Sequence, residues 1–323
     1  MRRRRGALAA LLLPLVLVPP WNGEPRLPLL GERVAVRASG WVPEGGWPAR
    51  IGALTPLGAL RLSAADPAFG GFSAMVARRG SLTLLGDGGT FVRIAIRGAT
   101  LTTLASGNLP AGPGTGWQKS DRDSESLAID PATGRLWVGF ERANAIWRFA
   151  PAFARWQRRA TPRAMRHWRQ NSGAESLVRL HDGRFLVIPE GSGRQVEPRR
   201  ALLFAGDPTA PGARPRPFRY RPPPGYAPSD AAVLPDGDVL VLNRRFRLPL
   251  VFTTRLVRIP ARAIRAGGTS SGRVIATLGP ELAGENAEGL AVTREGDATM
   301  LWIVTDNDAA SWRPTILAKF RLE

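Results

Sequence analysis

Residues 125–128 read Glu-Ser-Leu-Ala, and this segment recurs as Glu-Ser-Leu-Val at 175–178 and as Glu-Gly-Leu-Ala at 288–291. Weaker copies lie at 73–76 and 230–233, which read Ser-Ala-Met-Val and Asp-Ala-Ala-Val. The copies start 50 to 58 residues apart. A period of this length indicates one supersecondary unit per repeat.

Each copy continues in the same order, with a glycine turn, a short apolar run that is typical of a strand, and a polar residue that ends the run. The turn glycines are Gly80, Gly134, Gly183, Gly237 and Gly296. The polar stops are Asp87, Glu141, Glu190, Asn243 and Asp306. Glycine accepts the positive φ that tight hairpin turns require, so each repeat is predicted to be a strand, a turn and a returning strand.

Short strands at regular spacing predict an all-β fold, and a repeat of this length is typical of β-propeller blades of four-stranded antiparallel sheet. The 323-residue chain, without its first 22 residues, has room for six blades at the observed spacing. Five are visible as repeats. We expect the sixth to be assembled from residues 32–62 and 315–322, so that the N- and C-terminal strands close the ring. The sequence therefore predicts one propeller domain over residues 23–323.

The hairpin pattern places acidic residues at one mouth of the propeller channel. If an inner strand starts at this mouth, its partner strand returns there, and the acids that open the repeats should form a ring beside the ring of polar stops. The carboxylates expected to hold a metal ion are Glu125, Glu141, Glu175, Glu190, Asp230, Glu288 and Asp306, with Asp87 as a weaker candidate.

Carboxylates that converge on a narrow opening repel one another unless cations or hydrogen bonds compensate. Oxygen ligands on a rigid ring suit a hard cation, and Ca²⁺ is preferred over Mg²⁺ where many carboxylates can reach the ion. Such an ion would polarise a phosphoryl or carbonyl oxygen and activate water. The candidate catalytic carboxylates are Glu125, Glu175 and Glu288.

Arginines follow two of the polar stops directly, and guanidinium groups fit phosphate oxygens. The candidate substrate-binding residues are Arg142, Arg244 and Arg245. The alternative interpretation is structural, because acids at strand starts also bind backbone N–H groups or neighbouring arginines.

Composition excludes several kinds of site. The chain has no cysteine, which excludes a thiol nucleophile, a disulfide framework and a cysteine metal site, and its two histidines leave little for histidine chemistry. Lys and Arg number 45 against 26 Asp and Glu, a formal net charge of +19. This charge favours anionic partners. The arginines are spread over the whole chain, however, which a bias in coding composition would also produce.

Residues 155–169 interleave six arginines with two tryptophans, a combination found where nucleic acid or anionic lipid binds. We interpret the segment instead as an exposed excursion whose tryptophans pack on a blade. We expect a small anionic, phosphorylated substrate, no nucleic-acid partner and a monomer.

The first 22 residues are predicted to be an export signal or an N-terminal membrane tether. Residues 2–5 are four arginines, and the apolar stretch at 6–18 is shorter than the roughly 20 residues that a membrane-spanning helix needs. No small-x-small cleavage site follows, so retention as a tether remains open. We expect a periplasmic or secreted protein with possible peripheral or tethered membrane association.

Several of these segments together resemble the esterase-like phytase (phytase-like) family of exported bacterial proteins. The segments that carry the resemblance lie at residues 69–73, 121–130, 141–142, 171–177, 229–237, 286–291 and 305–308. The resemblance implies a propeller related to phytase-type hydrolases and a phosphoester or ester substrate. The sequence departs from the family pattern at Ser126 and Ser176, where glycine usually follows the acid, and at Asn243, which replaces an acid before Arg244.

The leading hypothesis is therefore an exported hydrolase of phosphate esters or related esters, with a metal-assisted site at one mouth of the propeller. The rival is a non-catalytic propeller of the cell envelope that binds a ligand or partner and whose acids are structural. A sugar-lactone or ester hydrolase on the same fold is a third alternative.

Overall fold

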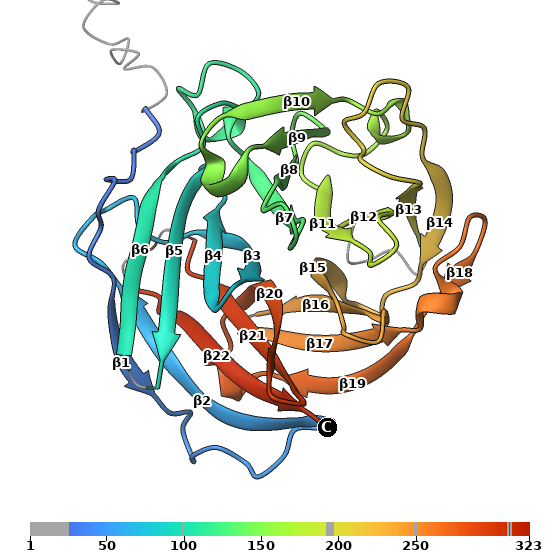
Figure 1. Cartoon of the computed structure of the whole chain (residues 1–323). Helices are drawn as coiled ribbons and strands as arrows, with labels where there is room; N and C mark the ends of the chain where they lie inside the picture. The colour runs from blue at the N-terminus through green and yellow to red at the C-terminus, as the bar shows by residue number, and fades with distance from the viewer. Residues whose placement is uncertain (1–25, 99, 192–196, 249–250, 309, 311) are drawn as a thin grey trace, which may run out of the picture.

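The computed structural model describes residues 26–323 apart from 99, 192–196, 249–250, 309 and 311. The described part of the chain forms five β-sheets, antiparallel except for one short edge strand, arranged as blades around a central channel (Figure 1). The predicted β-propeller class is confirmed. Residues 1–22, the predicted signal or tether, lie outside the described residues.

In each of the first four blades the innermost strand comes first in the chain, and the later strands follow outward. The first blade consists of β3 (Phe72–Arg78), β4 (Ser81–Gly86), β5 (Thr90–Arg97) and β6 (Thr100–Asn108). The second consists of β7 (Ser124–Ile129), β8 (Leu136–Phe140), β9 (Ala145–Phe149) and β10 (Trp156–Ala160). The third consists of β11 (Ala174–Arg179), β12 (Phe185–Pro189), β13 (Arg199–Phe204) and β14 (Arg216–Tyr220), with the short parallel strand β18 (Thr269–Ser270) at its edge. The fourth consists of β15 (Ala227–Val233), β16 (Val239–Arg247), β17 (Val251–Ile259) and β19 (Arg273–Leu278).

The predicted number of six blades is wrong, because the terminal strands complete the fifth blade instead of forming a sixth. This blade consists of β20 (Asn286–Glu295), β21 (Ala298–Asp306), β22 (Thr315–Leu322), β2 (Leu54–Ser63) and β1 (Arg37–Trp41). The strand β22 pairs with β21 on one side and with β2 on the other. Closure of the ring by N- and C-terminal strands is thus confirmed, and it protects edges that would otherwise remain unpaired.

The excess length that suggested a sixth blade lies partly in a leading segment outside the blades. Residues 30–36 run beside β6, where Val34 N–H donates to Ser106 Oγ at 2.9 Å and Leu30 N–H donates to Asn108 Oδ1 at 3.0 Å. The repeat count, and not the ratio of chain length to period, therefore gives the number of blades.

The five turn glycines lie where the sequence predicts them, between the two innermost strands of each blade. Their φ angles lie between 60° and 89°, in the region that favours glycine. Each inner hairpin consequently leaves one mouth of the channel, turns at the far face and returns, as the motif geometry requires.

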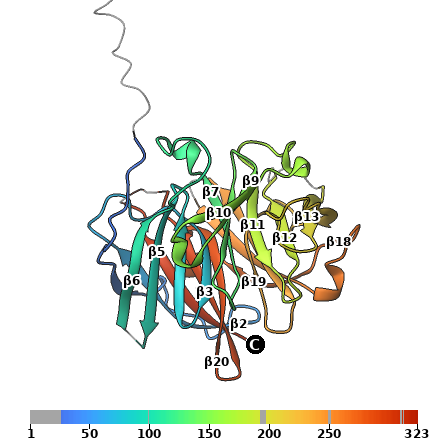
Figure 2. The same ribbon diagram turned by 45° about the horizontal axis from the view of Figure 1, so that its top comes forward.

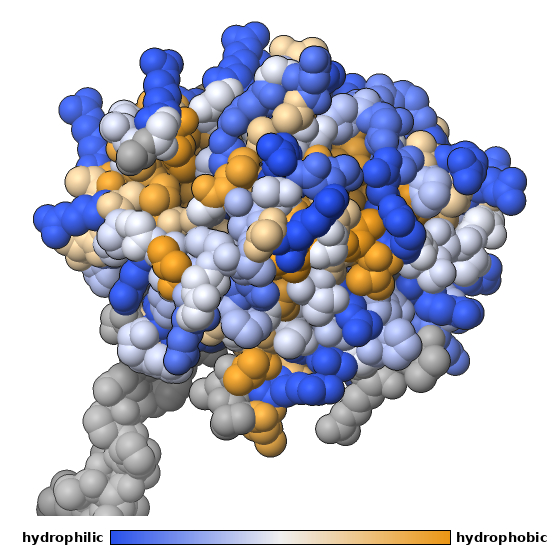
Figure 3. Space-filling model, turned by 90° about the horizontal axis from the view of Figure 1, so that it is seen from below, coloured by the Kyte–Doolittle hydropathy of each residue, from blue (hydrophilic) through white to orange (hydrophobic). Residues whose placement is uncertain are grey.

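Apolar packing holds neighbouring blades together. In the described residues, each of the five blade-to-blade interfaces contains one cluster of buried side chains. Between the first and second blades, for example, Val76 packs with Leu127 and Val138. Figure 3, a view from below, shows hydrophilic residues over much of that face with separate apolar patches among them.

Helical structure is limited, in the residues described, to single 3-10 turns in the connections. These turns are η1 (Lys119–Asp121), η2 (Pro151–Phe153), η3 (Arg163–Met165), η4 (Ala261–Ala263) and η5 (Pro280–Leu282). Across the described ranges, no helix has the length and apolar character needed to cross a membrane. The loops that carry η1 and η3 precede and follow the second blade, and Figure 2 shows green loops of this part of the chain at the top of the tilted view.

The channel changes character along its axis. Its half away from the strand starts contains a cavity of about 400 Å³ lined mainly by apolar residues of the five innermost strands, among them Leu127, Leu177 and Leu290. The other half of the channel, where the five innermost strands start, contains the mouth that the sequence predicts to be acidic.

Candidate functional site at the channel mouth

A β-bulge lies at the start of every innermost strand. Each ladder shifts register by one residue at the same place, and the extra residues are Ser73, Glu125, Glu175, Ser229 and Glu288. A bulge changes the direction of the side chain it carries. Three glutamates are thereby placed at equivalent positions around the mouth.

Two groups of carboxylates meet at this mouth and share one residue. Asp123, Glu125 and Glu141 each have a carboxylate oxygen within 4.8 Å of the others, and so do Glu141, Glu175 and Glu190. Glu141 ends the second strand of the second blade, whereas Glu175 and Glu190 belong to the third blade. The polar stop of one blade therefore meets the bulge glutamate of the next, which is the convergence that the hairpin geometry predicts.

Glu141 and Glu175 are close enough to share a proton through a side-chain hydrogen bond. Burial raises the pKa of Glu141 to about 7, despite the opposing effect of that hydrogen bond. Burial, together with the charges of Glu190 and Glu125, also raises the pKa of Glu175 well above its ordinary value. A carboxylate pair of this kind needs a proton or a cation to be stable at neutral pH.

Glu125 belongs to the group with Asp123 and Glu141 and remains partly exposed. Burial and the charges of Glu288 and Asp87 raise its pKa well above the ordinary value. Its environment therefore favours the protonated form of a carboxyl group that still reaches solvent.

On the opposite side of the mouth, Glu288 is held by two partners. Asn286 Nδ2 donates to Glu288 Oε1 at 2.7 Å, and Arg244 Nη1 contacts the same oxygen. Arg244 Nη2 also lies 3.1 Å from Glu190 Oε1. Burial alone would lower the pKa of Arg244, but the carboxylates of Glu288 and Glu190 outweigh it and raise that pKa. The guanidinium thus joins two acids of the ring.

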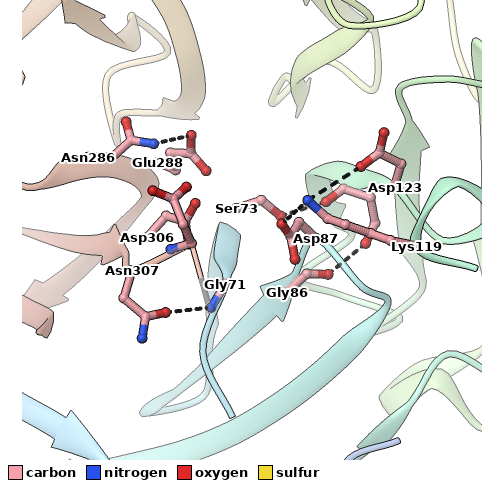
Figure 4. A network of polar contacts seen from close by, with 12 residues as sticks. Gly71, Ser73, Gly86, Asp87, Lys119, Asp123, Asn286, Glu288, Asp306 and Asn307 are labelled. Carbon is pink, nitrogen blue, oxygen red and sulfur yellow. Dashed lines mark hydrogen bonds and ion pairs between the residues drawn. The ribbon is translucent and has the colours of Figure 1, made fainter. Parts of the chain in front are cut away.

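Asp306 lies beside Glu288, as Figure 4 shows. Burial and the charges of Glu288 and Asp87 raise the pKa of Asp306 well above its ordinary value. One Asp306 oxygen accepts the N–H of Asp308 at 2.8 Å. Next to it, Asn307 Oδ1 accepts the N–H of Gly71 from the first blade at 2.9 Å. The C-terminal end of the ring is therefore tied to its first blade at the mouth.

The remaining part of the mouth contains two residues that were not among the sequence-predicted site residues, Lys119 and Asp123 (Figure 4). Lys119 Nζ lies 2.5 Å from Asp87 Oδ2 and 4.0 Å from Asp123 Oδ1. Asp123 also binds Arg142 Nε at 3.0 Å. Asp123 could have been found from its position two residues before Glu125, but Lys119 comes from the loop turn η1, for which the repeat gives no signal.

Two sequence-predicted site residues are directed elsewhere. Asp230 is buried one residue past its bulge, and its carboxylate accepts the N–H groups of Leu290 at 2.7 Å and Ala231 at 2.8 Å. Arg245 stacks on Tyr226, with the guanidinium carbon 4.6 Å from the ring centroid. The structure brings neither residue into the two carboxylate groups, and among the described residues Asp230 is instead a link between blades.

The departures from the family pattern also have local explanations. Ser126 Oγ donates to the carbonyl of Ala174 in the next blade at 2.5 Å. Asn243 is fully buried, and its Oδ1 accepts the Tyr220 hydroxyl at 2.9 Å. Nothing in the described structure explains Ser176, whose buried Oγ has no hydrogen-bond partner there.

The donor set at the mouth fits a hard divalent cation. Its atoms are carboxylate oxygens from two neighbouring blades, and burial together with the charges of neighbouring carboxylates raises the pKa of several of these groups. Ca²⁺ takes six to eight oxygen ligands and tolerates variable geometry. The arrangement is therefore suited to Ca²⁺ binding and, beside a bound ion, to reactions in which negative charge develops on an oxygen.

Comparison with solved structures finds several similar chains at low identity. Glutaminyl cyclase of Myxococcus xanthus has 11% identity and a TM-score of 0.45, with 91% of this chain and 100% of that chain covered. A luciferin-regenerating enzyme has 11% identity and a TM-score of 0.42, with 89% and 95% covered. Kuenenia stuttgartiensis hydrazine synthase has 10% identity and a TM-score of 0.38, with 75% of this chain covered, and this chain spans 58% of that one.

No curated protein matches the chain. A family profile does match, over residues 67–309, and its description is "Phytase-like: Esterase-like activity of phytase". The matched range contains every carboxylate of the channel mouth and four complete blades. Because this match covers most of the chain, the protein belongs to the phytase-like family.

Proposed function

We propose that the protein is an exported hydrolase of phosphate esters or related esters, with a metal-assisted site at the acidic mouth of the propeller. The observation that carries the proposal is the position of Glu141, which joins two groups of carboxylates from adjacent blades. Membership of the phytase-like family supports the ester substrate.

In this proposal Ca²⁺ is held by carboxylates of the two groups. The ligands are Asp123, Glu141, Glu175 and Glu190, and Glu125, the fifth member of the two groups, is left free for proton transfer. When bound, the ion would stabilise negative charge on an ester oxygen and lower the pKa of a coordinated water. The rest of the chemistry is assigned to the side chains around it.

Glu125 is the best candidate for proton transfer. It is partly exposed, and burial together with the charges of Glu288 and Asp87 raises its pKa, which favours the protonated carboxyl that a general acid needs. Glu175 shares a hydrogen bond with Glu141 and would orient the Glu141 carboxyl. Glu288 is fixed by Asn286 and Arg244, so we assign it a positioning role at the edge of the site.

The arginines are assigned different roles. The Arg142 side chain is 48% exposed and is bound to Asp123 at the rim, so it can reach an anionic substrate from the solvent side. Arg244 is occupied by Glu190 and Glu288 and compensates their charge. Arg245 faces Tyr226, which argues against its predicted contact with substrate.

The test is turnover of a panel of phosphate monoesters and carboxylic esters, with Ca²⁺ and with EDTA. We expect Ca²⁺-dependent hydrolysis that falls at least tenfold in Glu125→Gln. The matched control is Glu295→Gln, which removes an acid paired with Lys319 outside the channel mouth and should retain activity. Absence of turnover with any metal would remove the hydrolase proposal and leave the non-catalytic ligand-binding propeller.

Export is proposed from residues 1–22 and has its own test. N-terminal sequencing of protein from the periplasmic and membrane fractions should find either a shortened chain or an intact tether. Full-length protein confined to the cytoplasmic fraction would contradict it.

A further inference from the structure

A second pocket lies away from the acidic mouth, between the first and second blades. It has a volume of about 420 Å³, within the range of small-ligand sites. One wall contains the β3–β4 turn and β5, and the other contains the β7–β8 turn and η2. Since these two turns lie at the far face of the propeller, the pocket is separate from the carboxylate groups.

Four arginines line this pocket, and no acidic residue does so among the described residues. They are Arg78, Arg79, Arg93 and Arg97. Arg78 donates to the backbone carbonyl of Pro131 at 3.1 Å, across the blade boundary. Within the described structure the other three make no ion pair, and the buried Nε of Arg93 has no hydrogen-bond partner. Arg148, a partly buried arginine elsewhere in the chain, is by contrast paired with Asp207.

Apart from Ser81 and Thr83, the rest of the lining is glycine and apolar residues. The rings of Phe91 and Phe153 pack with centroids 4.9 Å apart, and Leu104 remains 46% exposed at the pocket. An anion without an apolar part would leave this surface in contact with water.

Backbone strain is concentrated at the same place. Arg79, Ala152 and Phe153 line the pocket, and all three have left-handed φ angles of 48°, 55° and 57°. Such conformations in residues other than glycine cost about 1–3 kcal/mol each and are enriched at ligand sites. Here they shape both walls of one cavity.

We propose that this pocket binds an organic anion that carries an apolar group, with its sulfonate, phosphate or carboxylate on the arginines and its apolar part on Phe91, Phe153 and Leu104. Guanidinium groups bind such oxyanions through paired N–H donors. Neither the phytase-like family description nor the proposed hydrolase function is needed for this inference. Two sources share this chemistry: an organic anion free in solution, and the headgroup and upper chain of an anionic lipid.

The probe is octane-1-sulfonate, because it has the required anion and chain but no ester bond that the acidic mouth could hydrolyse. Calorimetric titration of the full protein in EDTA should give saturable binding. Methanesulfonate and octan-1-ol, which lack the chain and the charge respectively, should bind at least tenfold more weakly. Titration with phosphatidylcholine vesicles, with and without phosphatidylglycerol, distinguishes a membrane source from a soluble one.

Two variants locate the binding. The double variant Arg93→Gln/Arg97→Gln should weaken octane-1-sulfonate binding at least tenfold, which corresponds to about 1.4 kcal/mol. Leu104→Gln alters an exposed side chain, so it should weaken octane-1-sulfonate binding without affecting folding. The charge-matched control is Arg273→Gln, an exposed arginine of β19 outside the pocket lining, which should retain binding.

The possible results of these titrations either support the proposal or overturn it. Binding of octane-1-sulfonate that is weakened by the pocket variants supports the proposal. If the same variants also weaken binding to anionic vesicles, the ligand is a lipid; if they do not, it is a soluble anion. Three results overturn the proposal. The first is no saturable binding of octane-1-sulfonate, and the second is a loss of affinity in Arg273→Gln equal to that in the double variant. The third is unchanged affinity in both Leu104→Gln and the double variant. Binding to anionic vesicles alone would indicate general surface charge and would also overturn it.

Discussion

Replacing Arg244 by glutamine removes the cation that joins Glu190 and Glu288 at the channel mouth. The side chain of Arg244 is 21% exposed and that of Glu288 is 8% exposed. Loss of one partner from a buried ion pair costs about 3–5 kcal/mol, because the other charge is left uncompensated. Glu190 is more exposed than Glu288, so water compensates part of its charge. We therefore expect the free energy of unfolding to fall by about 3 kcal/mol, the lower end of this range. At roughly 2–4 °C per kcal/mol for a domain of about this size, the melting temperature in EDTA should fall by about 6–12 °C.

The assay is differential scanning calorimetry of the wild type, Arg244→Gln and Arg245→Gln, each in EDTA and in Ca²⁺. Arg245 is the matched control, since it is adjacent in β16 but stacks on Tyr226 outside the carboxylate groups. We expect Ca²⁺ to stabilise Arg244→Gln more than the other two proteins, because its mouth carries more uncompensated negative charge and binds the cation more tightly. An equal response to Ca²⁺ in both variants would refute the reasoning.

Three further predictions concern pH and blade contacts. Since burial holds the pKa of Glu141 at about 7 against an ordinary 4.5, the native state keeps a proton that the unfolded chain loses. Urea titrations in EDTA should therefore show stability falling as pH rises from 4.5 to 7, by up to about 1.4 kcal/mol per pH unit, and a flat profile would contradict this. Ser126→Ala removes a buried hydrogen bond to Ala174 and should cost about 1 kcal/mol in urea unfolding, whereas an unchanged midpoint would show that the bond adds nothing. Burial alone would raise the pKa of Asp207, but hydrogen bonds from Thr209 and Trp137 outweigh burial and lower that pKa. Asp207→Asn should therefore be destabilising above pH 3.8, and this loss of stability should disappear as the pH falls through the lowered pKa. An Asp207→Asn penalty that persists at lower pH would assign the effect to packing.

The sequence predicts the inner hairpins because each repeat carries its own local signals. The turn glycines adopt positive φ, and the polar stops return to the mouth beside the strand starts. Closure by residues near both termini is also readable, since unpaired strand edges are unfavourable. The number of blades is not readable from length, because strands β1 and β2 and the segment beside β6 carry no copy of the repeat.

The candidate site is predicted in part, and the errors have structural causes. A β-bulge shifts the register by one residue, so Ser229 and not Asp230 occupies the position equivalent to Glu125. A repeat aligned by chemical similarity alone places the acid Asp230 there. Lys119 reaches the mouth from a loop, and its contact with Asp87 depends on tertiary structure that no local pattern encodes.

The central claim is that carboxylates from adjacent blades form one cation site, and calorimetric titration with Ca²⁺ tests it most directly. At pH 8, where Glu141 is expected to be ionised, the wild-type protein should bind Ca²⁺ saturably, and Glu141→Gln should bind it at least tenfold more weakly because both carboxylate groups lose their shared member. No binding by the wild type, or equal affinity in the two proteins, would contradict the claim.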